Sequence, residues 1–175
     1  YDGAWGISAH VDHDSKYPDA LQDYACGNRT YDLDIGYNHK GTDIFPWPFP
    51  WFQMENDLQH VVAVTGGTIL KKEDGNPDHN CSMRDGGDWN AVYIIHPDSS
   101  IAWYGHLKKG SLTSKQAGEK VDQGEIIGRV GSSGASTGPH LHFELYNKLG
   151  ELVDPFGGEC DSDSKGLDWL SHKPY

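Results

Sequence analysis

The sequence HLHFEL, from His140 to Leu145, alternates polar and apolar residues as a half-buried β-strand does. His140, His142 and Glu144 therefore share one face of the predicted strand, and the apolar residues between them enter the core. Residues two positions apart lie about 7 Å apart along a strand, so one imidazole can bind a metal ion while its neighbour reaches a metal-bound water. The small residues of segment 131–139, GSSGASTGP, would let a substrate backbone come close to these rings.

A second candidate is HKGTD, which places His39 four residues before Asp43. In a fully extended chain these two residues would lie about 13 Å apart, too far for ligands whose bonds to zinc are about 2 Å long. The chain must therefore bend, and Gly41 is the residue that permits the bend. Together with His142, the pair would supply two nitrogens and one oxygen. A fourth tetrahedral position would stay open for water, as a catalytic zinc site requires.

The third candidate is His106 in WYGHL, at the end of an apolar run and directly after Gly105. A histidine at a strand end can point into a site on the sheet face. Each motif also has a structural explanation: an HxH pair is commonly a surface feature, and His106 could be a hydrogen-bonded core residue. The remaining histidines lack such partners, and we interpret them as surface or structural residues: His10, His13, His60, His79, His96 and His172.

Short β-rich runs separated by Gly, Pro and Asp turn clusters surround these motifs, which is typical of an antiparallel all-β sandwich or barrel with little helix. The expected strands are Val61–Val64, Thr68–Lys72, Ala91–Ile95, Ile101–Gly105, Glu125–Val130 and His140–Tyr146.

The chain divides into three parts on this interpretation. Residues 1–30 are polar and irregular and form an extended arm, with a helical turn near Asp19–Tyr24. Residues 31–160 form the domain that carries the motifs. Residues 161–175 form a tail packed on the same domain, with a helical turn at Lys165–His172.

Two long connections interrupt the strands. In Ile44–Asn56, a Pro at every second place from Pro46 to Pro50 argues against a ladder strand and favours an extended loop. Its aromatic residues either pack on the barrel or form a wall of a substrate cleft. The second connection, Glu73–Asn90, is long enough to need an external tie, and a disulfide at Cys81 would provide one. We interpret its acidic residues as solvated, because their spacing does not match a calcium-binding EF-hand.

Composition restricts the class of protein. A chain of 175 residues can bury one core, and no run approaches the roughly 20 apolar residues of a membrane span. A net charge of -12 makes nucleic acid an improbable partner. We expect a monomer.

The three cysteines, Cys26, Cys81 and Cys160, lie far apart without a CxxC motif, which excludes a thiolate zinc ribbon. They predict one disulfide and one remaining thiol, with three pairings open. The chain starts at Tyr1, with no initiator Met or leader. We therefore expect a secreted, extracellular protein whose signal and pro-segment have been removed.

Taken together and in this order, HKGTD, WYGHL and GSSGASTGPHLHFEL resemble the signature of the lysostaphin/LytM/LasA-type zinc metallopeptidases, over roughly Tyr31 to Phe156. VDQGEIIGRVGSSG also resembles the β-core of that family, and a pseudoalterin-like enzyme is the narrower likeness. The resemblance implies that His39, Asp43 and His142 bind one Zn²⁺. It implies that His106 and His140 are the catalytic histidines, with assistance from a tyrosine, either Tyr31 or Tyr37.

The implied activity is a zinc endopeptidase that cuts the peptide cross-links of bacterial peptidoglycan, at glycine-containing bonds; glycine-rich protein is a second substrate. No HExxH glutamate is present, so one of His106 and His140 would orient or deprotonate the water. The other would stabilise the oxyanion or protonate the leaving amine, and the two assignments stay open. The alternative is an inactive relative that binds cell wall or a partner amidase. A lipoyl-type carrier is disfavoured because Asp122–Gly131 contains no lysine.

Overall fold

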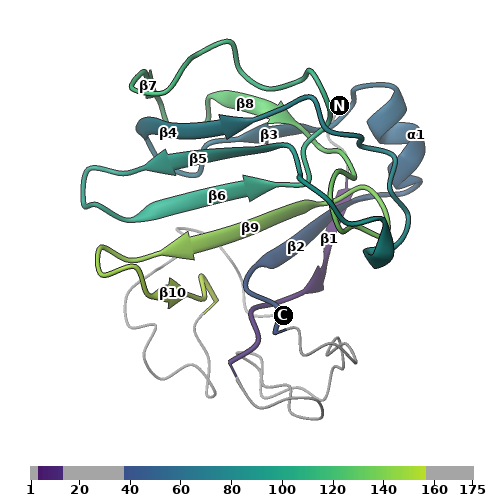
Figure 1. The fold of residues 1–175 in the computed structure, drawn as a ribbon, viewed down its shortest axis with the longest axis horizontal. Coiled ribbons are helices and arrows are strands. Elements are labelled where there is room, and N and C mark those ends of the chain that lie inside the picture. The colour runs from purple at the N-terminus through teal and green to yellow at the C-terminus, as the bar shows by residue number, and fades with distance from the viewer. Residues whose placement is uncertain (1–3, 14–37, 157–175) are drawn as a thin grey trace.

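The computed structural model of the protein describes residues 4–13 and 38–156 (Figure 1). Short strands dominate these ranges, with one short α-helix and one 3-10 turn. In chain order the elements are β1 (Ala4–Ala9), β2 (Thr42–Trp47), α1 (Pro50–Glu55), β3 (His60–Val62), β4 (Gly67–Glu73), η1 (Met83–Asp85), β5 (Ala91–Ile95), β6 (Ile101–Gly105), β7 (Lys120–Val121), β8 (Ile126–Arg129), β9 (Leu141–Tyr146) and β10 (Leu152–Val153).

The strands form one large and one small antiparallel sheet. The large sheet has eight strands, in the order β1-β2-β9-β6-β5-β4-β7 with β10 added to β9, and the small sheet consists of β3 and β8. Figure 1 shows the long strands of the large sheet as one twisted layer, with β3 and β8 drawn near β4. The predicted antiparallel all-β fold with little helix is confirmed. All six predicted strands are present, with ends displaced by at most two residues.

The hydrophobic core lies between the two sheets. Val92, Tyr104 and Phe143 are in register across β5, β6 and β9, and all three are buried. The small sheet contributes Val61 from β3 and Ile127 from β8 to the same hydrophobic cluster. Because side chains alternate along a strand, the residues next to this core row must face the other side of the large sheet.

The residues on that other side include the predicted metal ligands. Asp43 on β2 is paired in register with His142 on β9, and His142 with Gly105 on β6. His142 is adjacent in sequence to Phe143, so packing of the Phe143 ring into the core turns the imidazole to the opposite face. The predicted alternation of β9 therefore sets the orientation of the site.

The proline-containing segment differs from its prediction as a loop. β2 continues through Pro46, which is paired with Trp5 of β1. β9 pairs only with Thr42 to Ile44, so Pro46 has a neighbouring strand, β1, on one side alone. The backbone N–H that proline lacks is therefore not needed for pairing with a second strand. The chain then forms α1, with Pro50 in the first turn, where a missing backbone N–H removes no helical hydrogen bond.

The arm also differs from its prediction as irregular. Within it, Ala4–Ala9 forms β1, which extends the large sheet beyond β2. The helical turns expected near Asp19–Tyr24 and at Lys165–His172 lie outside the described residues.

The expected disulfide at Cys81 is absent: this residue carries an exposed, free thiol, while Cys26 and Cys160 lie outside the described residues. Hydrogen bonds hold the long connection instead. Asn76 donates from its backbone N–H to the Asn90 side chain at 2.9 Å, and Asn80 donates to the Ser132 carbonyl at 3.1 Å.

Candidate metal centre

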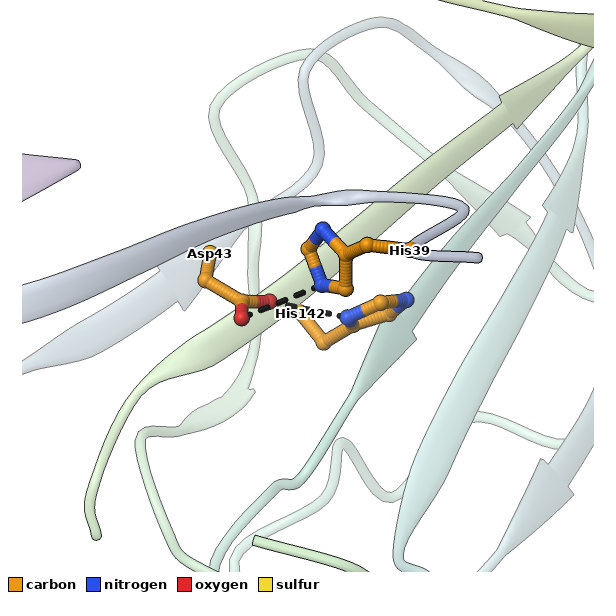
Figure 2. A group of neighbouring side chains, drawn as sticks. All are labelled: His39, Asp43 and His142. Carbon is orange, nitrogen blue, oxygen red and sulfur yellow. Dashed lines mark hydrogen bonds and ion pairs between the residues drawn. The ribbon is translucent and has the colours of Figure 1, made fainter. Parts of the chain in front are cut away.

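Three predicted ligands converge on the outer face of the large sheet. Figure 2 shows His39, Asp43 and His142 with their polar ends pointing toward one another. Asp43 Oδ2 lies 3.1 Å from His39 Nε2, and Asp43 Oδ1 lies 2.8 Å from His142 Nδ1. One ligand atom from each residue falls within 4.8 Å of the others. In the described part of the chain, no other group of three such side chains meets this spacing.

A close backbone approach at Gly41 makes this convergence possible. A Cβ there would lie 2.6 Å from His142 Nε2 and 2.8 Å from the Phe143 carbonyl oxygen. Gly41 is not among the glycines with positive φ. Glycine is therefore required for space at this bend, and the dihedral freedom invoked from the sequence is not the reason.

Each histidine of the group is held through its second nitrogen. His39 Nδ1 donates to the His10 carbonyl oxygen at 2.8 Å, and His142 Nε2 donates to Glu144 Oε1 at 2.9 Å. The Tyr146 hydroxyl donates in turn to the other oxygen of Glu144. Such outer partners fix the tautomer and orientation of a metal-binding imidazole. The shared face of β9 could have indicated Glu144, whereas no sequence signal marks a backbone carbonyl such as that of His10.

The electrostatics of the group favour a cation. Burial by itself lowers the pKa of His142, but hydrogen bonds to Asp43 and Glu144 outweigh it and raise the pKa to about 9. Burial raises the pKa of Asp43, and the hydrogen bonds to His142 and His39 more than reverse this, leaving the pKa well below its usual value. Burial also raises the pKa of Glu144, but the hydrogen bond to His142 outweighs it and lowers the pKa, so two carboxylates stay ionised around His142. The donor set, two nitrogens and one oxygen with an anionic surrounding, fits Zn²⁺.

The other two predicted site residues lie beside this group. His106 and His140 have ring centroids 4.5 Å apart, and the His106 ring lies 5.6 Å from that of His142. Nδ1 of His106 donates to the Ser133 carbonyl at 2.6 Å, and Nδ1 of His140 donates to the Gly138 carbonyl at 2.7 Å. A carbonyl can only accept, so Nδ1 carries the proton in the neutral form of each ring. Each Nε2 is thereby left as an acceptor, and that of His140 lies 3.6 Å from Asp43 Oδ1.

His106 has an unusual backbone and a perturbed pKa. Its φ of 58° lies in the left-handed region directly after β6, a conformation that tends to cluster at functional sites. Burial, reinforced by the neighbouring His140 and His142, lowers the pKa of His106 to about 3. The imidazole is therefore neutral at physiological pH.

Trp89 packs against this histidine cluster and was not singled out from the sequence. Its ring centroid lies 5.1 Å from that of His106 and 5.7 Å from that of His142. A Cβ on Gly105 would lie only 2.2 Å from Trp89 Cζ3, so the glycine leaves room for the indole. Trp89 Nε1 donates to the Tyr93 hydroxyl at 3.0 Å, which anchors the ring.

A pocket of about 310 Å³ opens next to the group, and Asp43 and His140 form part of its wall. Three residues of Ile44–Asn56, the aromatic segment, also line it: Phe45, Pro50 and Trp51. Other aromatic residues of that segment remain exposed: Trp47, Phe49 and Phe52. The second sequence interpretation, a cleft wall, therefore describes part of this segment.

Of the remaining histidines, His10 contacts the candidate ligands through its backbone carbonyl, which accepts from His39 Nδ1. His13 contacts Asp154 at 2.7 Å, His96 is buried against the Gly66 carbonyl, and His60 is exposed. His79 binds two carboxylates on the surface. Tyr31, Tyr37 and His172 lie outside the described residues. Within the described residues, no helix is both long and apolar enough to cross a membrane.

Comparison with known families identifies the sequence pattern. The profile described as peptidase family M23 matches residues 37–155, which contain all five predicted site residues. Lysostaphin from Staphylococcus simulans is 42% identical over 139 residues, 78% of this chain and 23% of lysostaphin. The structure of the lysostaphin catalytic domain superposes with a TM-score of 0.54 at 25% identity, covering 86% of this chain and 89% of that domain.

Two further relatives carry informative names. Glycyl-glycine endopeptidase ALE-1 from Staphylococcus capitis is 32% identical over 120 residues, 67% of this chain and 27% of that protein. Peptidoglycan DD-endopeptidase ShyC from Vibrio cholerae is 39% identical over 84 residues, 48% of this chain and 18% of that protein. The chain therefore spans about a quarter or less of the length of these curated relatives.

Proposed function

The chain belongs to peptidase family M23, and from that membership we propose that it is a secreted, monomeric zinc endopeptidase that cuts peptide cross-links of bacterial peptidoglycan. The observation that carries the proposal is the convergence of His39, Asp43 and His142, whose ligand atoms lie within 4.8 Å of one another. Three protein ligands with space for a fourth are the arrangement of a catalytic zinc site, whereas structural sites are closed by four.

His39, Asp43 and His142 would hold the ion. Zinc supplies Lewis acidity, which polarises a peptide carbonyl and strengthens water as a nucleophile near neutral pH. Asp43 contributes the single negative charge of the ligand set. Glu144 and the His10 carbonyl keep the two imidazoles in the required tautomers through hydrogen bonds of 2.9 and 2.8 Å.

His106 and His140 would move the protons. Both rings are fixed by Nδ1–H donation to backbone carbonyls, so each presents Nε2 to a substrate. One Nε2 can accept a proton from the attacking water, and the protonated ring can return it to the leaving amine. A protonated or hydrogen-bonding imidazole can also stabilise the developing oxyanion. In this proposal the Nε2 atoms of His106 and His140 take the role of the glutamate base of an HExxH motif, which the sequence lacks.

The substrate proposal draws on the named relatives and on the pocket. One relative is named for peptidoglycan and another for glycyl-glycine bonds. Small residues at 131–139 border the site, as does the pocket with Asp43 and His140 in its wall. Such a border admits a backbone without side chains. We therefore place the scissile bond next to glycine.

The experiment is to incubate the protein with purified peptidoglycan and with pentaglycine, with and without a chelator, and to measure new amino termini. The expected result is metal-dependent cleavage, restored by adding Zn²⁺ and absent in His142→Ala. Glu151→Ala is the control that should cleave normally, because Glu151 is exposed in the turn after β9 and its carboxylate accepts from Asn147, not from a site residue. A zinc-loaded protein that binds the wall and never cuts it would identify the non-catalytic binding module instead.

A further inference from the structure

Trp51 is placed to meet whatever enters the pocket beside the metal ligands. It belongs to α1 and lines the same pocket as Asp43 and His140. Gly138 and Pro139 also line this pocket and form a rim with little side chain, so an extended chain in the pocket would lie against the indole.

The indole offers a hydrogen-bond donor at this rim. Trp51 Nε1 lies 4.0 Å from the position of a Cβ on Gly138. Among the described residues, no hydrogen bond from this N–H is found, in contrast to Trp89, whose N–H is used by Tyr93. An indole nitrogen can only donate. Its natural partner is therefore an acceptor such as a peptide carbonyl.

His79 supports the ring of Trp51. The two rings are stacked, with centroids 5.9 Å apart and planes 26° apart. His79 is itself held at both nitrogens, by Glu55 of α1 at 2.6 Å and by Asp78 of its own loop at 2.8 Å. Asp78 also accepts from the backbone N–H of Lys109 at 2.7 Å, which ties this support to the body of the protein.

We propose that Trp51 is a specificity-determining residue: it forms the wall of a subsite for a glycine-containing peptide next to the scissile bond and donates from Nε1 to a backbone carbonyl, while His79 is a positioning residue that holds the indole in place. This proposal rests on the proposed peptidase function and names the residues that select its substrate. Glycine suits the subsite because its peptide plane can approach the indole with no side chain between them. A larger residue would keep the carbonyl away from the donor.

Trp51→Ala tests the wall on the zinc-loaded protein with pentaglycine and penta-alanine as substrates. We expect the KM for pentaglycine to rise roughly tenfold, as for loss of one useful hydrogen bond with its packing, while kcat, zinc content and melting temperature stay near those of the wild type. The preference for pentaglycine over penta-alanine should also shrink. Phe52→Ala is the matched control, since Phe52 is the next residue of α1 and is 60% exposed, outside the pocket.

The positioning role of His79 is tested by a double-mutant cycle. His79→Ala should raise KM in the wild-type background and have no further effect in Trp51→Ala, because its contribution passes through the indole. Additive effects of the two changes on KM would overturn the positioning role.

The remaining outcomes also decide the proposal. An unchanged KM and preference in a folded Trp51→Ala would overturn it, and so would a loss of zinc, which would make Trp51 a support of the metal group. Should Trp51→Ala not fold, Trp51→Phe takes its place, because it keeps a ring and lacks the donor. An unchanged KM in Trp51→Phe would overturn the proposal as well.

Failure of the proposed function gives a different pattern from failure of the subsite. If the zinc-loaded wild type cuts neither pentaglycine nor peptidoglycan, the peptidase proposal fails. Calorimetric binding of pentaglycine to that same protein then tests the subsite: weaker binding by Trp51→Ala and normal binding by Phe52→Ala uphold it, and no difference between the variants overturns it.

Discussion

Replacing Gly41 by alanine is a sharp test of how the candidate metal centre is built. The added Cβ would lie 2.6 Å from His142 Nε2 and 2.7 Å from His142 Cε1, where ordinary contact begins at 3.4 Å. The imidazole would have to retreat by about 0.8 Å, or the strand would have to move. Movement of the strand is resisted, because the Phe143 carbonyl at 2.8 Å belongs to β9, which is paired on both sides.

The magnitude follows from the tolerance of metal coordination. Ligand distances in zinc sites vary by only about 0.2 Å. The displacement of the imidazole by about 0.8 Å is larger than this, so it takes His142 out of coordination range or away from Glu144. Loss of an outer hydrogen-bonding partner alone weakens metal binding by about 10–100-fold. We therefore expect Gly41→Ala to bind zinc at least that much more weakly and to lose about 1–3 kcal/mol of unfolding free energy through overpacking.

The assay is competition for zinc against a chromophoric chelator, with thermal unfolding of the metal-free protein as a separate readout. Gly87→Ala is the matched control, because a Cβ on Gly87 would have no atom within 4 Å and should change neither quantity. Wild-type zinc affinity in a folded Gly41→Ala would show that the close approach at His142 does not shape the candidate metal centre.

Three further predictions concern single side chains. His106→Ala should keep its zinc and lose roughly a hundredfold in kcat, the usual contribution of a general acid or base; normal cleavage would remove its assigned role. Glu144→Ala should weaken zinc binding by about 10–100-fold through the orientation of His142, and unchanged affinity would contradict this. Hydrogen bonding to Glu55 raises the pKa of His79, so the stability that the pair contributes is complete below the unfolded pKa near 6.5 and is lost as pH rises through the folded value. The difference in unfolding free energy between wild type and His79→Gln, at most about 1 kcal/mol for an exposed pair, should therefore be larger at about pH 6 than at about pH 9; the opposite trend would refute the sign.

The sequence was most informative where local periodicity and tertiary burial agree. The alternation of HLHFEL predicted a strand with His142 on one face and Phe143 on the other, and β9 has this arrangement because Phe143 is buried in the core. The bend in HKGTD followed from chain geometry alone. Its cause did not, because the contact between Gly41 and His142 joins segments about a hundred residues apart.

Predictions failed where pairing partners decide the structure. Pro46 argues against a strand by its own chemistry, yet it lies in β2 because only β1 flanks that part of the strand. The polar residues after Tyr1 gave no strand signal, and β1 exists through its register with β2. Cys81 was assigned a disulfide because its connection is long, whereas side-chain amides such as that of Asn90 hold it.

The position of the candidate metal centre on the sheet ties its register to that of the hydrophobic core. Asp43, His142 and Gly105 form one row across β2, β9 and β6, and the adjacent row, with Phe143 and Tyr104, is buried in the core. A slip of one residue in β9 would exchange the two rows, placing an imidazole in the core and a phenyl ring in the site. The hydrophobic burial that selects the fold therefore also selects the register of the candidate metal ligands.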